Sequence, residues 1–168
     1  MHTEPCNVLF LCTGNSARSV MAEALLNVLG QGRFKAYSAG SFPSGKVQPM
    51  AARLAEAFGY HEPLRSKSWD EFSAAGAPQM DFIITVCDNA AGEVCPIWPG
   101  QPVTAHWGVP DPVAVDGTEE ARQRAFQSAW MMLRRRVELL LALPVEKLDR
   151  MSVRQALCAI GQEGEREH

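Results

Sequence analysis

The apolar and polar positions of this chain alternate between two periods, and this alternation predicts the order of its elements. Short apolar runs bounded by turn residues are typical of buried strands, and they occur at 7–12, 34–40, 80–87 and 102–107. Apolar residues at helical spacing predict helices at 19–29, 48–59, 68–76, 118–143 and 148–160. Strands separated by helices predict a single α/β domain, with a four-stranded parallel sheet and helices on both faces. We assign that domain to residues 1–147, and a C-terminal helical extension with a polar tail to 148–168.

Composition narrows the class of protein. The 168 residues are 46% hydrophobic and 21% charged, which are ordinary values for one globular domain with a full core. The net charge of −3 argues against nucleic acid as a partner, so an anionic ligand would need a local site. No apolar run reaches the ~18 residues that span a bilayer, and the N-terminal residues do not read as a signal peptide. We therefore expect a cytoplasmic protein with no membrane partner.

Three segments that carry reactive side chains each follow a predicted strand. Cys12 ends the first strand, Cys87 ends the third, and the loop 108–117 follows the fourth. Ligands of such sheets bind outside the carboxyl ends of the strands, so we expect all three segments to open onto one edge. The five cysteines include no Cys-x-x-C pair that would indicate structural zinc, and we predict no bound metal.

The segment after the first strand predicts an oxyanion site. Between Cys12 and Arg18 lie small or polar residues, and Ser19 follows; the intervening residues are Thr13, Gly14, Asn15, Ser16 and Ala17. Wrapped between a strand and a helix, their backbone N–H groups can converge on an anion, and the helix dipole adds to the attraction. Arg18 can bind two oxygens of a tetrahedral oxyanion. Residues 13–19 are therefore the predicted substrate-binding set.

The same field predicts that Cys12 is a nucleophile. A thiol at a helix N-terminus near a guanidinium can have its pKa lowered from about 8.5 into the ~3.5–7.5 range. We therefore expect a Cys12 thiolate at neutral pH, with Ser19 placed to hydrogen-bond it. Such a thiolate is suited to in-line attack on phosphorus or arsenic. The competing interpretation is that Cys12 is a small buried residue at a strand end.

Expelling a group from the resulting adduct needs a general acid. Asp111 is the candidate, in a loop that Pro110 and Pro112 restrain; the competing interpretation is an ordinary turn. Asp88 and His106 are rivals, although a lone histidine near a strand end is more often a packed residue.

Cys87 and Cys95 are either a redox pair or two unrelated buried thiols. If Cys12 carried an arsenic adduct, Cys87 could attack Cys12, and Cys95 could then attack Cys87, leaving a disulfide for an external reductant. One helix over 87–95 would separate the two Cα atoms by about 12 Å, whereas a disulfide needs less than about 7 Å. We therefore expect a loop or a segment that unwinds, with 88–95 the most mobile internal part of the chain.

Four segments resemble the arsenate reductases built on the low-molecular-weight tyrosine phosphatase fold: VLFLCTGNSARSVMAE, YSAG, ITVCDNAAGEVCPIWPG and HWGVPDPV. The resemblance implies reduction of arsenate to arsenite, with phosphate or sulfate as competing oxyanions. It implies that Cys12 is the nucleophile, Arg18 the oxyanion ligand and Asp111 the acid, with Cys87 and Cys95 as the redox relay. It further implies no bound cofactor, and a thioredoxin or glutathione/glutaredoxin system that reduces the disulfide.

Two departures from that family bear on partners. Ala17 stands where several thioredoxin-linked members have a cysteine, which leaves the choice of reductant open. Some members bind potassium near the loop, and Asn15, Ser38 and Glu23 could match its ligands. Because the aspartate of that set has no clear counterpart near Asp70, we do not predict the ion.

Two other functions compete with arsenate reduction. A low-molecular-weight protein tyrosine phosphatase would need Cys12, Arg18 and Asp111 but neither of the other two cysteines. Phosphatases of this fold usually place tyrosines after the Asp-Pro pair, whereas here Val113 and Ala114 follow. A non-catalytic oxyanion sensor would be favoured by a missing nucleophile or arginine, and both residues are present.

Overall fold

The computed structural model describes residues 5–74, 76–87 and 102–162. These residues form one parallel sheet with the strand order β2-β1-β3-β4. The strands are β1 (Cys6–Cys12), β2 (Phe34–Gly40), β3 (Phe82–Thr85) and β4 (Val103–His106). The described helices are α1 (Arg18–Leu29), α2 (Pro49–Ala57), α3 (Asp70–Ser73), α5 (Glu119–Leu141) and α6 (Arg150–Gln162), with short 3-10 turns at Pro112–Ala114 and Val145–Lys147.

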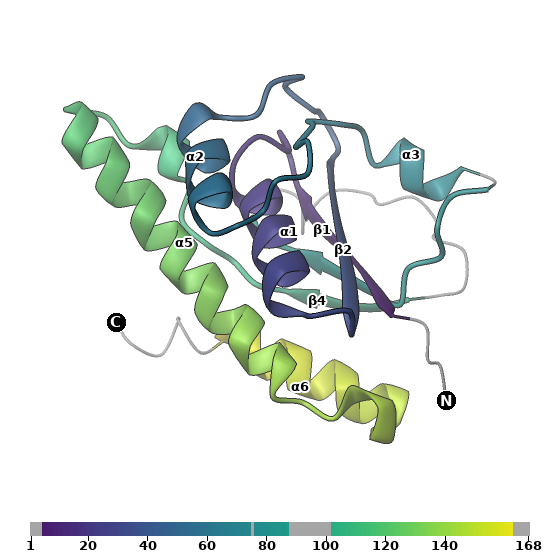
Figure 1. Ribbon diagram of the computed structural model, residues 1–168. Helices are drawn as coiled ribbons and strands as arrows, with labels where there is room; N and C mark the ends of the chain where they lie inside the picture. Colours follow the sequence, from purple (N-terminus) through teal and green to yellow (C-terminus); the bar gives the residue numbers. More distant parts are fainter. Residues whose placement is uncertain (1–4, 75, 88–101, 163–168) are drawn as a thin grey trace.

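The predicted single α/β domain with a four-stranded parallel sheet is confirmed, and helices lie on both of its faces (Figure 1). The third and fourth strands are shorter than expected. In each of these two strands only four residues form ladder pairs with the neighbouring strand. Single backbone bonds from Asp81 N–H to Asn7 O and from Val86 N–H to Leu11 O extend the contact of β3 with β1. No helix in the described part of the chain is long and apolar enough to cross a bilayer.

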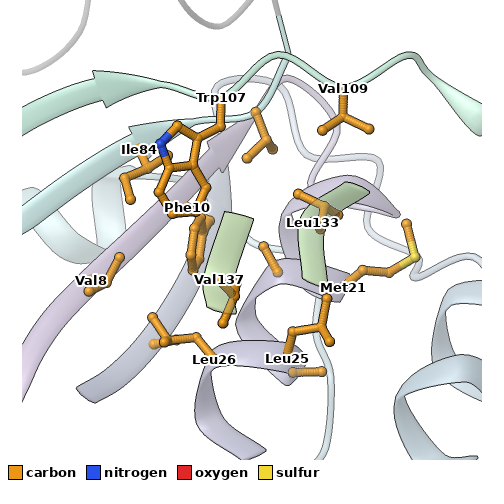
Figure 2. Packing of buried hydrophobic residues seen from close by; sticks show 14 of the residues in the cluster. Val8, Phe10, Met21, Leu25, Leu26, Ile84, Trp107, Val109, Leu133 and Val137 are labelled. Atoms are coloured by element: carbon orange, nitrogen blue, oxygen red, sulfur yellow. The ribbon is translucent and has the colours of Figure 1, made fainter. Parts of the chain in front are cut away.

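The alternation of side chains along β1 divides the core between the two faces. Val8, Phe10 and Cys12 join the large cluster formed with α1, α2, α5 and α6, whereas Leu9 and Leu11 join a small cluster with Phe72 of α3. Figure 2 shows Phe10 beside Trp107, whose ring centroids are 5.9 Å apart, within the large cluster. Burial on both faces explains why residues 8–12 of β1 are all apolar.

The C-terminal helix α6 packs against the edge strand β4. Trp107, which follows β4, is fully buried, and its Nε1–H donates to the Leu157 carbonyl at 2.9 Å. Gly161 lies so close to β4 that a Cβ there would fall 2.1 Å from the His106 carbonyl oxygen. The apolar side of α6 shares the large core with α5, so residues 150–162 take part in holding the end of β4 in place.

The strand order places a topological switch point between β1 and β3. From β1 the chain passes through α1 to β2 on one side, and later returns to β3 on the other side of β1. The carboxyl ends of β1 and β3 therefore border a switch point, where open α/β sheets bind their ligands. Cys12 ends β1, and Cys87 lies two residues beyond β3, so both cysteines reach this point.

Candidate active site

The loop between β1 and α1 turns its carbonyl oxygens outward. Thr13 O accepts from the N–H of Phe42, Gly14 O from the N–H of Ser44, and Ser16 O from the N–H of Gln48, at 2.8–3.0 Å. Since peptide N–H and C=O groups point in opposite directions, these outward carbonyls orient the amides of the same peptide units toward the inside of the loop. The result is a concavity lined by N–H donors, which is what an oxyanion needs.

Asn15 holds the bend of this loop. Its φ of 47° is in the left-handed region, which asparagine tolerates better than most residues. The buried amide donates from Nδ2 to Ser19 Oγ at 2.8 Å, and its Oδ1 accepts from the Lys67 N–H at 2.8 Å. The structure thus joins Ser19 to Asn15, so at least one role of this serine is to fix the loop.

Gly40, at the end of β2, allows the loop to lie directly against the neighbouring strand. A Cβ at this position would fall 2.4 Å from the Thr13 carbonyl oxygen and 2.8 Å from that of Cys12. Both contacts are with backbone atoms, which cannot rotate away. The YSAG segment therefore ends in glycine because there is no room for a side chain. The glycine is visible in the sequence, but only the structure shows that the loop after β1 is what lies against it.

The amino end of α1 adds electrostatic attraction to the loop. Among the described residues, no side chain caps this end of the helix, and the first turn holds no acidic residue. The free N–H groups of the first turn are therefore available to a ligand. Arg18, the first residue of the helix, has a side chain only 14% exposed. Its Nη1 donates to the Val109 carbonyl at 2.9 Å, and its Nη2 lies 3.6 Å from Asp111 Oδ2.

Two sulfur atoms meet beneath the loop. Cys12 and Cys87 are both buried, with 5% and 2% of their surface exposed. Thr13 N–H donates to Cys87 Sγ at 3.4 Å, and the two cysteine sulfurs share a hydrogen bond. Parallel strands with helical crossovers thus bring together two thiols that are 75 positions apart in sequence, as expected for residues that border one switch point.

The expectation that Cys12 is already a thiolate at neutral pH is wrong for this structure. Its hydrogen bond with Cys87 and its burial raise the pKa of the Cys12 thiol above its ordinary value, although the Arg18 guanidinium and the Gly14 N–H act to lower it. The prediction considered only the loop and the arginine. It left out the second thiol, which favours the neutral form of the first and removes water from it.

Asp111 lies at the edge of the same site. Its Oδ1 accepts from the Val113 N–H at 2.9 Å, so it caps the short 3-10 turn, and its Oδ2 faces Arg18. The ordinary-turn interpretation is therefore correct for Oδ1, which caps the turn, whereas Oδ2 faces the Arg18 guanidinium. The rival His106 is bound through Nδ1 to the Thr85 hydroxyl at 2.7 Å.

The remaining predicted residues divide by exposure. Thr13, Gly14 and Ser16 are partly exposed, whereas Asn15, Ala17 and Ser19 are buried, so the buried members can offer a ligand little more than backbone. Cys95, the rival acid Asp88 and the predicted mobile segment 88–95 lie outside the described residues.

Glu23 and Ser38, considered from sequence only as possible potassium ligands, belong to a buried polar cluster whose other members, Tyr60 and Lys67, sequence reasoning missed. Glu23 accepts hydrogen bonds from the Ser38 and Tyr60 hydroxyls at 2.7 and 3.0 Å, and the Lys67 ammonium lies 3.9 Å from its Oε1. Burial lowers the pKa of Lys67, and burial and then Glu23 raise that of Tyr60. Lys67 thus places a positive charge beside the carboxylate considered for potassium. Within residues 5–74, 76–87 and 102–162, no three His, Cys, Asp or Glu side chains gather to hold a metal.

Comparison with known proteins agrees with this geometry. Residues 7–154 match the family described as low molecular weight phosphotyrosine protein phosphatase. The chain belongs to this family. Among curated members, an arsenate reductase of Shouchella clausii is 34% identical over 120 residues, which are 71% of this chain and 84% of that protein.

Solved structures of the family agree in fold. The arsenate reductase of Archaeoglobus fulgidus has a TM-score of 0.58 and 30% identity, covering 78% of this chain and 98% of that one. A structure described as an arsenate reductase in the phosphate binding state has a TM-score of 0.63 and 27% identity, with 82% and 97% covered. The sequence resemblance to the arsenate reductases built on the fold of this phosphatase family is therefore confirmed.

Proposed function

We propose that this protein reduces arsenate to arsenite, with Cys12 as the nucleophile and Cys87 as the thiol that completes the reduction. The observation that carries the proposal is the meeting of two buried thiols beneath one oxyanion loop. Hydrolysis of a phosphate ester needs only one thiol, whereas the two-electron reduction of arsenic needs a second. The arsenate reductase relatives at 34% identity support the same substrate.

In the proposed first step, arsenate binds to the amides of the loop and to the Arg18 guanidinium. Because Cys12 is held neutral by Cys87 and by burial, the doubly charged oxyanion takes the Cys12 proton as it binds. The resulting thiolate attacks arsenic in line. Asp111 donates a proton to the departing oxygen, which leaves as water, and a Cys12–S–As(V) adduct remains.

The second step transfers the electrons. Cys87 attacks the Cys12 sulfur, forming a Cys12–Cys87 disulfide, while the electron pair of the S–As bond stays on arsenic. Arsenic is thereby reduced from As(V) to As(III), and the two thiols together lose two electrons. Cys95 then attacks the Cys87 sulfur, frees Cys12 as a thiolate and moves the disulfide to Cys87–Cys95, an exchange without net oxidation.

Turnover requires an external thiol reductant, either thioredoxin or a glutathione/glutaredoxin system, and no cofactor bound to the chain. Phosphate and sulfate, which share the tetrahedral shape of arsenate, should compete for the loop. The buried, mainly apolar surroundings of both thiols protect them from unrelated oxidants until the Cys87–Cys95 disulfide has formed.

Phosphotyrosine hydrolysis is the weaker candidate. Both tyrosines of the chain are engaged away from Asp111: Tyr37 packs on Phe72 with ring centroids 5.5 Å apart, and Tyr60 bonds to Glu23. Neither can flank an aromatic ring at the mouth of the site. Hydrolysis of small aryl phosphates, which needs only Cys12, Arg18 and Asp111, is expected as a side activity.

Assays of arsenate reduction and aryl phosphate hydrolysis in four proteins test the proposal. We expect Cys12→Ser to lose both activities, and Cys87→Ala to lose reduction while it keeps hydrolysis. Cys158→Ala, a cysteine variant in α6 far along the chain from the loop, is the control and should keep both. A Cys87→Ala protein that still turns over arsenate many times would remove the second thiol from the account.

A further inference from the structure

Arg136 is a buried charge that the proposed chemistry does not use. Arg136 lies on the apolar side of α5, with only 2% of its surface exposed. Its neighbours on that side of the helix include Leu133, Val137 and Leu140, all fully buried. A guanidinium is costly to remove from water unless its donors are satisfied, so its place in this apolar row calls for a specific partner.

That partner is the first residue of the Asp111 loop. Arg136 Nη1 donates to the Gly108 carbonyl at 2.7 Å, a short distance for a charge-assisted bond to a neutral oxygen. Gly108 stands between Trp107, which ends the pairing with β3, and Asp111. Figure 2 shows Trp107 and Val109 on this stretch of chain, with Leu133 and Val137 of α5 in the same cluster.

The bond from Arg136 completes a row of anchors along residues 107–109. The N–H groups of Trp107 and Val109 donate to the carbonyls of Thr85 and Val86, at 2.7 and 3.1 Å. The Val109 carbonyl accepts from Arg18, and the Gly108 carbonyl from Arg136. Pro110 follows with a fixed φ, so little freedom remains before Asp111.

The two arginines hold neighbouring carbonyls but differ in what else they do. Arg18 is proposed to bind the substrate, and its guanidinium must then divide its donors between the oxyanion and the Val109 carbonyl. Arg136 comes from α5 and binds a different carbonyl, that of Gly108, so it has no part in that exchange. Its bond to Gly108 can persist through the reaction while Arg18 turns to the substrate.

We infer that Arg136 is a positioning residue that keeps the Asp111 carboxyl aimed at the leaving oxygen, acting through the Gly108 carbonyl. This inference rests on the proposed function only in taking Asp111 as the general acid. Without the anchor, the loop can shift away from Arg18, and the proton donor is no longer within reach of the departing group. The oxyanion loop, which is held by residues 42–48 and by Lys67, should be unaffected.

The test uses two aryl phosphates that differ in how much they need a proton donor. Phenyl phosphate has a poor leaving group, while p-nitrophenyl phosphate has a good one. For Arg136→Gln we expect kcat/KM, which covers the step in which the leaving group departs, to fall about tenfold or more on phenyl phosphate and less than about threefold on p-nitrophenyl phosphate. The poor leaving group needs the proton, and general acid catalysis contributes about 10²–10⁴-fold. Inhibition by inorganic phosphate, which reports the oxyanion loop, should stay within about twofold of wild type.

Two further variants make the result decisive. Arg134→Gln removes a neighbouring arginine of α5 whose side chain is 39% exposed and pairs with Glu138, and it should behave as wild type with both esters. Arg136→Lys, which keeps a cationic donor and guards against simple unfolding, should restore most of the phenyl phosphate rate. Equal losses with both esters, or a ratio of the two rates unchanged from that of Arg134→Gln, would overturn the inference.

Failure of the inference and failure of the proposed function give different results. A wild-type protein that hydrolyses both esters but does not reduce arsenate would refute the reductase proposal and leave the role of Arg136 testable on the same esters. A wild-type protein that reduces arsenate, with an Arg136→Gln variant that keeps the normal ratio of ester rates, would refute the anchor alone.

Discussion

The Thr13 N–H donates to the sulfur of Cys87 across 3.4 Å, so the first amide of the oxyanion loop is bound to a residue just beyond the end of β3. This contact connects the two halves of the proposed reaction. The loop proposed to bind the oxyanion follows β1, and the thiol proposed to complete the reduction lies just beyond β3. Their contact follows from the position of both strand ends at the switch point of the sheet.

Removal of the second thiol should make the first one more acidic. The hydrogen bond with Cys87 is the largest cause of the raised Cys12 pKa, so Cys87→Ala should lower that pKa and increase the rate of Cys12 alkylation by iodoacetamide near neutral pH. The pH dependence of alkylation, followed by mass spectrometry of the Cys12 peptide, measures the shift. Cys6→Ala is the control and should leave the curve in place. An unchanged or higher Cys12 pKa in Cys87→Ala would contradict the coupling.

The same coupling predicts how the free energy of unfolding depends on pH. A group whose pKa is raised in the folded state contributes stability below its unfolded pKa, and that contribution is lost as the pH rises through the folded value. Wild-type protein should therefore lose stability above about pH 8.5, the ordinary pKa of a free thiol. Cys87→Ala should lose less over the same range, as measured by urea denaturation at a series of pH values.

A methyl group at position 40 should disturb the oxyanion loop. In Gly40→Ala the new Cβ would meet the carbonyl oxygens of Thr13 and Cys12, and one backbone must move. We expect a loss of about 1–3 kcal/mol in the free energy of unfolding, together with weaker inhibition by phosphate. Ser41→Ala is the matched neighbour: it removes a buried hydroxyl that has no hydrogen-bond partner within the described residues, and should be neutral or stabilising. Normal phosphate inhibition in Gly40→Ala would show that the close approach is not needed.

The ion pair of Glu23 and Lys67 should show coupling in a double-mutant cycle. Both side chains are about nine-tenths buried, so removing one partner leaves the other charged and poorly solvated. We expect Lys67→Met and Glu23→Gln each to cost about 1–3 kcal/mol, and the double variant to cost clearly less than their sum. Lys46→Met, at an exposed lysine, is the control. Strict additivity of the two substitutions would contradict a direct interaction.

The C-terminal helix should depend on one indole. Trp107→Phe removes the bond from Nε1–H to the Leu157 carbonyl and leaves a smaller side chain at a fully buried position. The expected cost is about 1–3 kcal/mol, with faster hydrogen exchange over residues 150–162. Met151→Ala, at a side chain 71% exposed on the same helix, should change neither. Unchanged exchange in Trp107→Phe would mean that α6 is held by apolar packing alone.

The arrangement of strands and helices could be predicted because each element has a local signal. β1 ends in an apolar run, residues 8–12, followed by small residues, and α1 has helical spacing from its first turn. The ends were less certain: the run 80–87 yields only Phe82–Thr85 as a strand, since ladder pairing depends on the neighbouring strand as well as on the run itself.

The sequence predicted the local part of the site and the sheet edge that its distant parts share, but not the contacts between those distant parts. The oxyanion loop, with its arginine six positions after its cysteine, is a local pattern. The acidity of Cys12 was mispredicted because its neighbour Cys87, which raises the Cys12 pKa, lies beyond the end of a different strand, 75 positions away in the sequence. Arg136 carried no signal either, since a charge within an amphipathic helix ordinarily lies on the solvated side; its role becomes visible only when Gly108 is found beside it.

The most direct test of the central claim is to map the disulfides that form during a single turnover of arsenate. Cys95→Ser protein, which cannot pass the disulfide onward, should accumulate a Cys12–Cys87 disulfide and release one arsenite per chain. Wild-type protein treated in the same way should carry a Cys87–Cys95 disulfide with a free Cys12. Arsenite released by Cys95→Ser without any Cys12–Cys87 disulfide would contradict the account.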